Sequence, residues 1–185
     1  MMKLKEKIDA LSAQTVMKRA GIKEGMHVAE IGTGGDGHVV FPIAKKVGEE
    51  GHVYAIEVQK NLLDLLERRA VDMDVHNVDF IHAHAELING TTLPNNTVDR
   101  IIYVNTMHQM EDKENALKEA ARILKEDGEI LIIDWGTQKG CPHPSLENYC
   151  FDPEDLAPTW KKANLVHIDT FDVSPYYWGT VLKHA

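Results

Sequence analysis

Cysteine is scarce in this sequence, and a long apolar run is missing altogether. The 185 residues include only Cys141 and Cys150, too few for a framework of disulfides. A membrane-spanning helix needs about 18 consecutive apolar residues, and the apolar runs here are far shorter. Residues 1–20 mix Lys and Glu with apolar residues and lack the apolar segment of a secretion signal. We therefore expect a cytoplasmic protein without a membrane span.

A surplus of basic residues is also lacking. The chain has 20 Lys and Arg against 29 Asp and Glu, a formal net charge of −9, and its basic residues are scattered singly. Nucleic acid and anionic membrane are therefore poor candidates for a partner. The content of 43% hydrophobic and 26% charged residues is typical of a globular chain. The length is sufficient for one domain, and we expect a single one.

Strand and helix patterns alternate along most of the chain. Apolar, β-rich runs predict five strands at residues 27–31, 52–58, 78–83, 98–104 and 129–134. Helical spacing predicts helices within residues 4–19, 39–47, 62–71, 112–128 and 154–163, whereas residues 136–149 have no period and are expected to form a loop. Alternating units of this kind indicate parallel strands with right-handed crossovers and helices on both faces.

The C-terminal pattern differs, because two alternating strands at residues 165–173 and 176–183 are separated only by Ser174 and Pro175. Such a short connection permits an antiparallel hairpin but no parallel crossover. The expected fold is therefore α/β: a doubly wound, mostly parallel seven-stranded sheet that ends in an antiparallel hairpin. Ligands of such sheets bind at the carboxyl ends of the strands.

A glycine cluster follows the first predicted strand, with glycines at positions 32, 34, 35 and 37. Glycines at this point let the backbone approach a ligand and expose amide N–H groups. Gly32, Gly34 and Gly37 also fit the dinucleotide pattern G-x-G-x-x-G, and Glu57 follows roughly 20 residues later, where an acid binds ribose hydroxyls. The glycines alone therefore leave a nicotinamide-dependent oxidoreductase open.

Glu30 favours a different ligand, because an acid two residues before the first glycine repels a pyrophosphate but suits a cation. S-adenosylmethionine carries a sulfonium and an ammonium group. Glu30 can hold the ammonium side or the glycine loop, or it can simply cap the loop amides. Glu57, at the end of the second strand, is a firmer candidate for a ribose ligand, with a surface acid as the alternative.

Four segments, taken in order, are similar to one known family. They are residues 25–34 (GMHVAEIGTG), 51–57 (GHVYAIE), 97–102 (TVDRII) and 121–134 (ARILKEDGEILIID). The chain resembles the class I S-adenosylmethionine-dependent methyltransferases of small-molecule type, and in particular the branch of the ubiquinone and menaquinone biosynthesis methyltransferases. The predicted hairpin agrees with the reversed seventh strand of that Rossmann-like fold. The resemblance implies that S-adenosylmethionine is the cofactor.

The resemblance also implies a set of cofactor-binding residues. Glu30, Gly32, Thr33 and Gly34 would surround the methionine part, Glu57 the ribose, Val58 the adenine face, His84, Ala85 and Glu86 the adenine edge, and Asn105 the transferring methyl. The single methyltransferase domain would comprise one or two leading helices (1–22), the cofactor-binding core (23–135), and a loop, helix and hairpin (136–185).

Two positions depart from the pattern of the family. Asp36 and Gly37 make the glycine loop one residue longer than usual, and His84 stands where many members have an Asp that binds the adenine amine. His84 can still contact the ring by stacking or through a ring nitrogen, or it can be a solvated loop residue. These departures motivate the alternative of a non-catalytic module that binds S-adenosylmethionine.

On the acceptor side, His108 is the candidate general base, because an unperturbed imidazole titrates near pH 6.5. The alternative is a pocket histidine without a chemical role, since in-line displacement of a sulfonium methyl does not require a base. Five aromatic residues could line an acceptor pocket or belong to the core: Tyr103, Trp135, Tyr149, Phe151 and Trp178. The short chain favours a small-molecule acceptor.

A metal site is not expected. Cys141, His143 and Cys150 offer three potential ligands and His82 with His84 two more, but no paired C-x-x-C spacing is present. With only two cysteines, an arsenic-type acceptor site is disfavoured as well. The oligomeric state cannot be predicted from the sequence.

Overall fold

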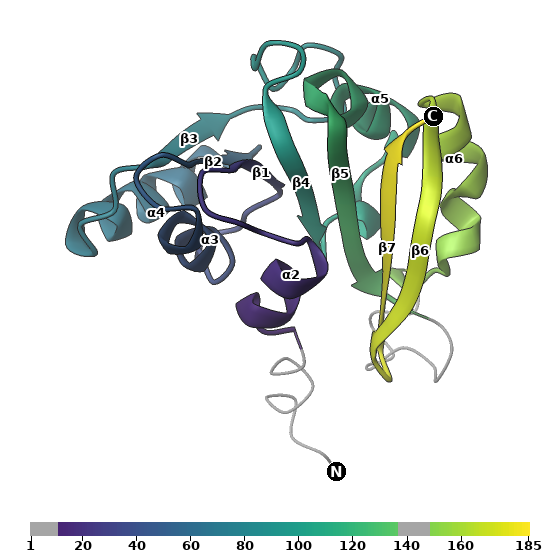
Figure 1. Cartoon of the computed structure of the whole chain (residues 1–185), viewed down its shortest axis with the longest axis horizontal. Coiled ribbons are helices and arrows are strands. Elements are labelled where there is room, and N and C mark those ends of the chain that lie inside the picture. Colours follow the sequence, from purple (N-terminus) through teal and green to yellow (C-terminus); the bar gives the residue numbers. More distant parts are fainter. Residues whose placement is uncertain (1–10, 137–148) are drawn as a thin grey trace.

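Seven strands form one sheet, in the order β3-β2-β1-β4-β5-β7-β6, in the computed structural model, which describes residues 11–136 and 149–185 (Figure 1). The strands are β1 (His27–Ile31), β2 (His52–Glu57), β3 (Val78–His82), β4 (Val98–Val104), β5 (Leu124–Trp135), β6 (Leu165–Ser174) and β7 (Tyr177–His184). The first five are parallel, and β7 is antiparallel to both β5 and β6. The expected fold class is confirmed.

Helices cover both faces of the sheet. They are α2 (Ala13–Arg19), α3 (Val40–Val47), α4 (Lys60–Asp72), α5 (Lys113–Ile123) and α6 (Ala157–Lys162), with 3-10 turns η1 (Met107–Gln109) and η3 (Pro153–Leu156). Alternate residues of β4 point to opposite faces: Ile102 and Val104 pack with α2 and α3, whereas Ile101 and Tyr103 pack with α5. Because both of its faces are buried, β4 ends in the continuous apolar run of residues 101–104, whereas the edge strand β3 keeps exposed polar residues.

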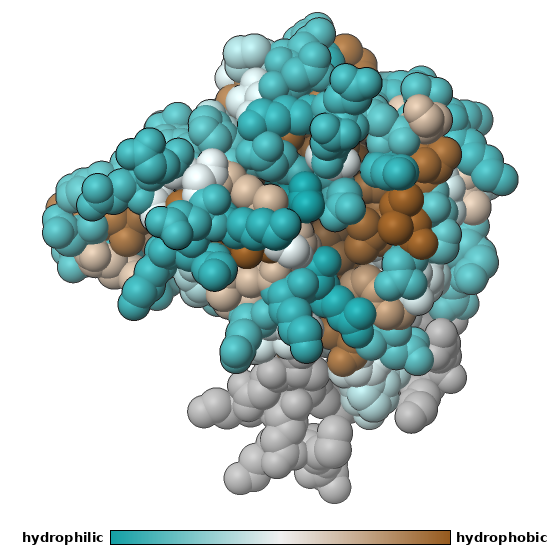
Figure 2. Space-filling model, in the orientation of Figure 1, coloured by the Kyte–Doolittle hydropathy of each residue, from teal (hydrophilic) through white to brown (hydrophobic). Residues whose placement is uncertain are grey.

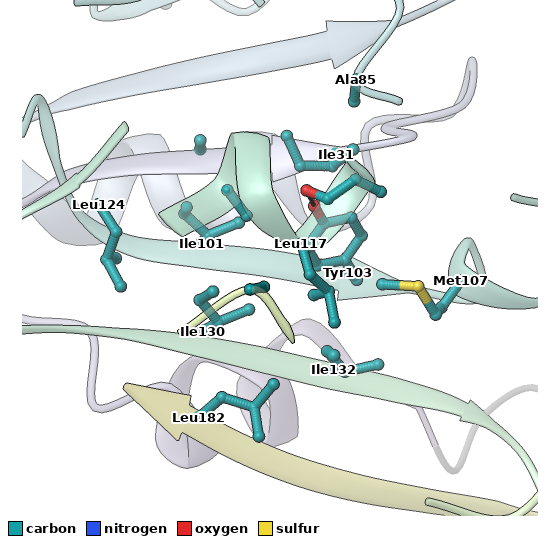
Figure 3. Packing of buried hydrophobic residues seen from close by; sticks show 14 of the residues in the cluster. Ile31, Ala85, Ile101, Tyr103, Met107, Leu117, Leu124, Ile130, Ile132 and Leu182 are labelled. Carbon is teal, nitrogen blue, oxygen red and sulfur yellow. Dashed lines mark hydrogen bonds between the residues drawn. The ribbon is translucent and has the colours of Figure 1, made fainter. Parts of the chain in front are cut away.

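Tyr103 marks the centre of the core between β4 and α5 (Figure 3). Its ring is fully buried among aliphatic side chains, and its hydroxyl donates a hydrogen bond to the carbonyl of Ala116 at 3.2 Å. Burial is the largest cause that raises the pKa of Tyr103. Tyr103 is therefore a core residue, the second of the two alternatives for this side chain.

The helix before β5 ends earlier than expected. Its predicted end lay near Asp127 and Gly128, but α5 ends at Ile123, and the chain is extended from Leu124 onward. Leu124 is fully buried and pairs with Val98 at the start of β4. Burial and strand pairing override the helical preference of the following Lys and Glu, as tertiary context often does.

Other boundaries differ by less. The predicted helix 154–163 begins as the 3-10 turn η3 and becomes α6 at Ala157. In the predicted helix 4–19, the described part begins at α2 with Ser12 as N-cap, whose side chain accepts from the Thr15 amide. Residues 4–10 and 137–148 lie outside the described residues, so most of the predicted loop 136–149, with Cys141 and His143, is not placed.

The connection between β3 and β4, residues 83–97, contains no helix. Instead, the buried carboxylate of Glu119 on α5 holds it: Glu119 accepts from the amides of Asn89 and Thr91, at 2.8 and 3.1 Å, and from the Thr91 hydroxyl. Arg122, one turn along α5, pairs with the same carboxylate at 2.7 Å. One buried ion pair thus fixes a loop that begins at the carboxyl end of β3.

The surface seen in Figure 2 shows apolar side chains gathered over β5 and β7, with polar side chains around them. Val166 and Ile168 of the neighbouring edge strand β6 are also exposed. Within the described parts of the chain, no helix combines the length and the apolar character that crossing a membrane requires.

Candidate active site

The glycine loop leaves β1 at its carboxyl end and packs tightly against the turn that follows β4. Gly32 has φ of +72°, and a Cβ added there would lie 2.3 Å from Cγ2 of Thr106. Gly34 also has a positive φ, +65°, but open space surrounds the position of its Cβ. Gly32 is therefore required for packing, whereas Gly34 keeps the loop surface free of a side chain.

Glu57, the last residue of β2, joins the glycine loop to the start of α4. Its Oε2 accepts from the Gly34 amide at 3.0 Å, and its Oε1 accepts from the amides of Val58 and Gln59, both at 3.0 Å. A carboxylate offers about four acceptor positions, so at least one remains for a ligand. The alternative of an unengaged surface acid is wrong, since Glu57 is only 6% exposed.

Glu30 lies behind the glycine loop and is almost fully buried. It accepts a hydrogen bond from the Thr33 hydroxyl at 2.8 Å. Burial raises the pKa of Glu30 to about 8, and the charges of Asp36 and Glu57 add to this effect, while the Thr33 hydrogen bond opposes it. Near neutral pH the carboxyl group of Glu30 is therefore mostly protonated, and a cation close to it would favour its ionised form.

A cavity of about 400 Å³ opens at the carboxyl ends of β1, β2 and β4, where the sheet topology predicts a ligand. It is lined by seven of the predicted cofactor-binding residues: Gly32, Gly34, Glu57, Val58, His84, Ala85 and Glu86. Glu30 and Thr33 are buried behind its wall, and Asn105 is not part of the lining.

Eight further residues line the cavity that the sequence did not single out: Ile31, Ile56, Gln59, Leu62, Ala83, Thr106, Gln109 and Met110. Several of them directly precede or follow a predicted site residue, and this position in the sequence could have indicated that they line the cavity. Gln109 ends the turn η1 after β4 and Met110 follows it, and no local sequence pattern indicates that this turn borders the cavity.

Asn105 follows β4 in a left-handed conformation with φ of +55°. Its Nδ2 donates to the hydroxyl of Tyr177, on β7, at 3.3 Å, and its Oδ1 is buried without a hydrogen-bond partner among the described residues. Burial, with the nearby charge of Asp134, raises the pKa of Tyr177 to about 12, although the Asn105 contact opposes this. An unpaired acceptor at the end of β4 suits a ligand that carries a donor or a positive charge.

His108 in η1 pairs with Asp134, a residue that was not predicted from the sequence to belong to the site. Its Nδ1 lies 2.7 Å from Oδ1 of Asp134, near the end of β5, and its backbone N–H donates to Oδ2 at 3.0 Å. The Asp134 side chain is fully buried, and the His108 side chain is 8% exposed. The two residues are 26 positions apart, so only the parallel pairing of β4 and β5 brings them together.

The aromatic residues around this pair divide into two groups. Trp135 stacks on Tyr177 with ring centroids 4.2 Å apart, and the Tyr149 ring meets the His108 ring edge-on at 5.2 Å. Trp178 is instead buried in the core, where its indole N–H donates to the carbonyl of Phe151 at 2.7 Å. Tyr149 thus lies beside the His108–Asp134 pair, whereas Trp178, the β7 partner of Asp134, has its indole in the core.

No metal-binding group of three or more His, Cys, Asp or Glu residues occurs among residues 11–136 and 149–185. A second hollow, about 920 Å³, lies between α3 and the C-terminal end of α4 and is bordered by Phe41, Lys45, Met73 and Asn77 among others. It contains no residue of the glycine loop and no strand end from the parallel carboxyl edge. The smaller cavity is therefore the one that the fold equips for a ligand.

Known proteins are similar to this chain in both sequence and structure. A family model described as "Methyltransferase domain" matches residues 22–177. The "Ubiquinone/menaquinone biosynthesis C-methyltransferase UbiE" of Pseudoalteromonas translucida is 28% identical over 145 residues, 77% of this chain and 55% of the relative. The "Demethylmenaquinone methyltransferase" of Listeria monocytogenes is 27% identical over 118 residues, 64% of this chain and 48% of the relative. The chain thus spans about half the length of these curated relatives.

Solved structures resemble the chain over nearly its whole length. A "SAM dependent methyltransferase" from Aquifex aeolicus has a TM-score of 0.84 and 27% identity, and the match covers 95% of this chain and 91% of that one. The "[4+2]-Cyclase SpnF" has a TM-score of 0.80 at 15% identity, covering 93% of this chain and 80% of that one, which shows a shared fold alone.

Proposed function

The chain belongs to the class I S-adenosylmethionine-dependent methyltransferase family, whose cofactor is S-adenosylmethionine, and from this premise we propose that it methylates a small-molecule acceptor. The observation that carries the proposal is the cavity at the carboxyl ends of β1, β2 and β4, where seven residues named from the family resemblance lie together. These residues come from three separate chain segments.

The site residues fit the cofactor in shape and charge. A cavity of about 400 Å³ is within the usual size range of small-molecule sites. The buried carboxyl of Glu30 suits a ligand with positive charge, because ionising it near a sulfonium and an ammonium group relieves the cost of its burial.

Each cofactor-binding residue has a proposed part in holding the molecule. Glu57 accepts from the ribose hydroxyls with its remaining acceptor positions, Val58 lies beside the adenine, and His84, Ala85 and Glu86 border the adenine edge. Glu30 and Thr33 support the glycine loop around the methionine part. Asn105 lies near the transferring methyl. The bound cofactor supplies an electrophilic methyl group, and the enzyme aligns the acceptor in line with it.

The class of molecule that accepts the methyl group is proposed from the names of the relatives. The names of the relatives describe methylation in quinone biosynthesis, and those names belong to proteins about twice the matched length. A reduced naphthoquinone is therefore the first acceptor to try, followed by smaller hydroxylated aromatics, amines and thiols. His108 is the proposed base for an acceptor that must lose a proton.

Calorimetric titration with S-adenosylmethionine, S-adenosylhomocysteine and reduced nicotinamide dinucleotide tests the proposal. We expect micromolar binding of both adenosyl ligands and none of the nicotinamide. Glu57→Gln should weaken adenosyl binding by at least tenfold, about 1.4 kcal/mol, because the amide places a donor among backbone N–H groups. Glu67→Gln, on the exposed face of α4, is the matched control and should bind as the wild type does.

Two outcomes would contradict the proposal. Failure of both adenosyl ligands to bind at millimolar concentration would mean that the cavity does not hold the cofactor. Tight binding of reduced nicotinamide dinucleotide would instead favour the alternative hypothesis, a nicotinamide-dependent oxidoreductase whose glycine loop binds a dinucleotide.

A further inference from the structure

Asp134 has a buried carboxyl group with three nitrogens within hydrogen-bond distance. Oδ1 accepts from the Trp135 amide at 2.8 Å and lies 2.7 Å from His108 Nδ1, and Oδ2 accepts from the His108 amide at 3.0 Å. Among the described residues, no Lys or Arg pairs with Asp134. Of the three groups that contact the Asp134 carboxyl group, only the His108 imidazole can titrate. A buried carboxylate is costly unless a hydrogen-bonding or charged partner compensates for its burial.

The two contacts with His108 fix the orientation of the imidazole, and they favour the tautomer with the proton on Nδ1 because an ionised carboxylate can only accept. The amide of His108 and its ring nitrogen bind different oxygens of one carboxylate, so the ring cannot rotate without breaking the shorter contact. A neutral imidazole that donates through Nδ1 has its lone pair on Nε2. The pair therefore presents Nε2 as the nitrogen that can accept a proton.

The pair lies at the border of the proposed cofactor cavity. His108 is in η1, and Thr106, Gln109 and Met110, the residues around it in the chain, line that cavity. Other titratable groups that face the pair are the hydroxyl-bearing rings of Tyr149, edge-on to the imidazole, and Tyr177, close enough for the charge of Asp134 to raise its pKa. One phenol, Tyr149, thus borders the imidazole, and a second, Tyr177, lies near the carboxyl group of Asp134.

We propose that Asp134 is a positioning residue that holds His108 in the Nδ1–H tautomer as the general base for the methyl acceptor. The inference rests on the proposed function. His108 Nε2 takes the proton of the acceptor X–H while the X electron pair attacks the methyl carbon and the C–S electron pair returns to sulfur. The products are X–CH₃, S-adenosylhomocysteine and an imidazolium that releases its proton to solvent. The acceptor is accordingly a nucleophile that carries a proton, and not one that is already an anion.

The Nδ1–H tautomer can be observed without knowing the acceptor. Long-range ¹⁵N–¹H correlation of the histidine rings in ¹⁵N-labelled full-length protein assigns the protonated nitrogen of each ring, with the His108 signals identified by their loss in His108→Gln. We expect the wild-type His108 to be protonated on Nδ1 in its neutral form. Protonation on Nε2 would overturn the inference.

The Asp134→Asn variant tests whether Asp134 sets the tautomer of His108 without disturbing the packing of the fold. It keeps the side-chain volume but replaces one acceptor oxygen with a donor group, so the Nδ1–H tautomer should no longer be uniformly populated. Asp99→Asn is the matched control, because Asp99 also accepts a backbone N–H, from His27 at 2.8 Å. Asp99 pairs with Lys125 near the amino end of β4, whereas His108 follows the carboxyl end of that strand. Asp99→Asn should leave the His108 tautomer unchanged. An unaltered tautomer in Asp134→Asn would contradict a positioning role.

Two further readouts complete the test. Asp134→Asn should bind S-adenosylmethionine within threefold of the wild type, whereas its kcat with reduced naphthoquinone, or with another acceptor of the panel, should fall by about 10²-fold or more. A loss of cofactor affinity larger than tenfold would show a structural role instead, and an unchanged kcat would overturn the base assignment. If no acceptor on the panel is methylated, the tautomer results alone decide the inference.

Failure of the inference and failure of the proposed function remain distinguishable. A wild-type protein that shows the Nδ1–H tautomer but binds no adenosyl ligand defeats the proposed function. A protein that binds the cofactor but shows the Nε2–H tautomer defeats only the role of Asp134.

Discussion

The proposed cofactor side and the proposed acceptor side of the site are built from different kinds of contact. Around β1 and β2, backbone groups dominate: the amides of Gly34, Val58 and Gln59 converge on Glu57. Around β4, β5 and β7, pairs of side chains take part as well: His108 pairs with Asp134, and Asn105 pairs with Tyr177. Backbone contacts depend on loop geometry, whereas side-chain pairs depend on residue identity.

This difference has a consequence for substitution. On the cofactor side, a change acts mainly through packing, backbone strain and burial of charge, so stability and cofactor affinity should respond together. On the acceptor side, a change removes one partner of a specific pair, so turnover should respond more than affinity. Four measurements test this division, from the largest expected effect to the smallest.

The largest effect should be a pH dependence of stability due to Glu30. Its pKa is raised to about 8 in the folded protein and lies at 4.5 in a model peptide, so the folded state retains a proton that the unfolded state releases. This stabilisation is complete below pH 4.5 and is lost as pH rises toward about 8. We expect the free energy of unfolding to fall by as much as about 4 kcal/mol over that range.

Urea titrations of the wild type and Glu30→Gln, taken from pH 5 to 8, measure this contribution. The difference between the two slopes isolates Glu30 from the other titrating groups. Parallel slopes would show that Glu30 titrates normally and would remove the charge argument for a cationic ligand.

Gly32→Ala should have the next largest effect. The added Cβ would lie 2.3 Å from Cγ2 of Thr106 at a positive φ, so we expect a loss of about 3 kcal/mol in unfolding free energy. Gly34→Ala is the control: its φ is also positive but its Cβ meets no atom, so strain alone should cost about 1 kcal/mol. Urea denaturation of both variants gives the comparison. Equal losses would contradict the packing of the loop against Thr106, in the turn that follows β4.

Glu119→Gln tests the loop that carries His84, Ala85 and Glu86. Glu119 is 1% exposed and accepts from Asn89, Thr91 and Arg122, so its loss should cost about 2 kcal/mol of stability and weaken cofactor binding as well. Glu114→Gln, on the same helix, is the control.

The Glu114 carboxylate pairs with Lys118 and Lys162 at the surface, where such pairs contribute little. Thermal unfolding and calorimetric titration of both variants decide the matter. A loss of stability without any change in affinity would mean that the loop does not shape the cofactor site.

Tyr177→Phe should have the smallest effect. It removes the hydroxyl that accepts from Asn105 at 3.3 Å, a contact worth about 1 kcal/mol of stability. Tyr103→Phe removes a comparable hydrogen bond inside the core and is the control. Thermal denaturation should give similar losses, but only Tyr177→Phe should alter the rate of methyl transfer. If both variants transfer the methyl group at the same rate, the proposal that Asn105 lies near the transferring methyl is contradicted.

The fold could be predicted from the sequence because its signals are local. The bounds of β1 and β4 agree with their apolar runs, and the two residues between the last strands allowed only a hairpin. The end of α5 was misplaced because Leu124 is extended only through its pairing with Val98, a contact that no local pattern encodes.

The two sides of the site differ in the same way. The glycine loop and Glu57 could be found because a motif fixes their spacing along the chain. Asp134 stood at the end of a predicted strand, but its partner lies 26 residues earlier, and nothing in the sequence pairs them. The Asn105–Tyr177 contact spans 72 residues and was missed for the same reason.

The most direct test of the central claim is an NMR titration of the ¹⁵N-labelled protein with S-adenosylhomocysteine, followed at the assigned backbone amides. We predict that the amides of Gly32, Gly34, Val58 and Ala85 shift together along one saturating curve, while those of Lys45 and Asn77 beside the second hollow do not move. Saturating shifts confined to Lys45 and Asn77, or no shifts at all, would contradict the assignment of the cofactor to the carboxyl ends of β1, β2 and β4.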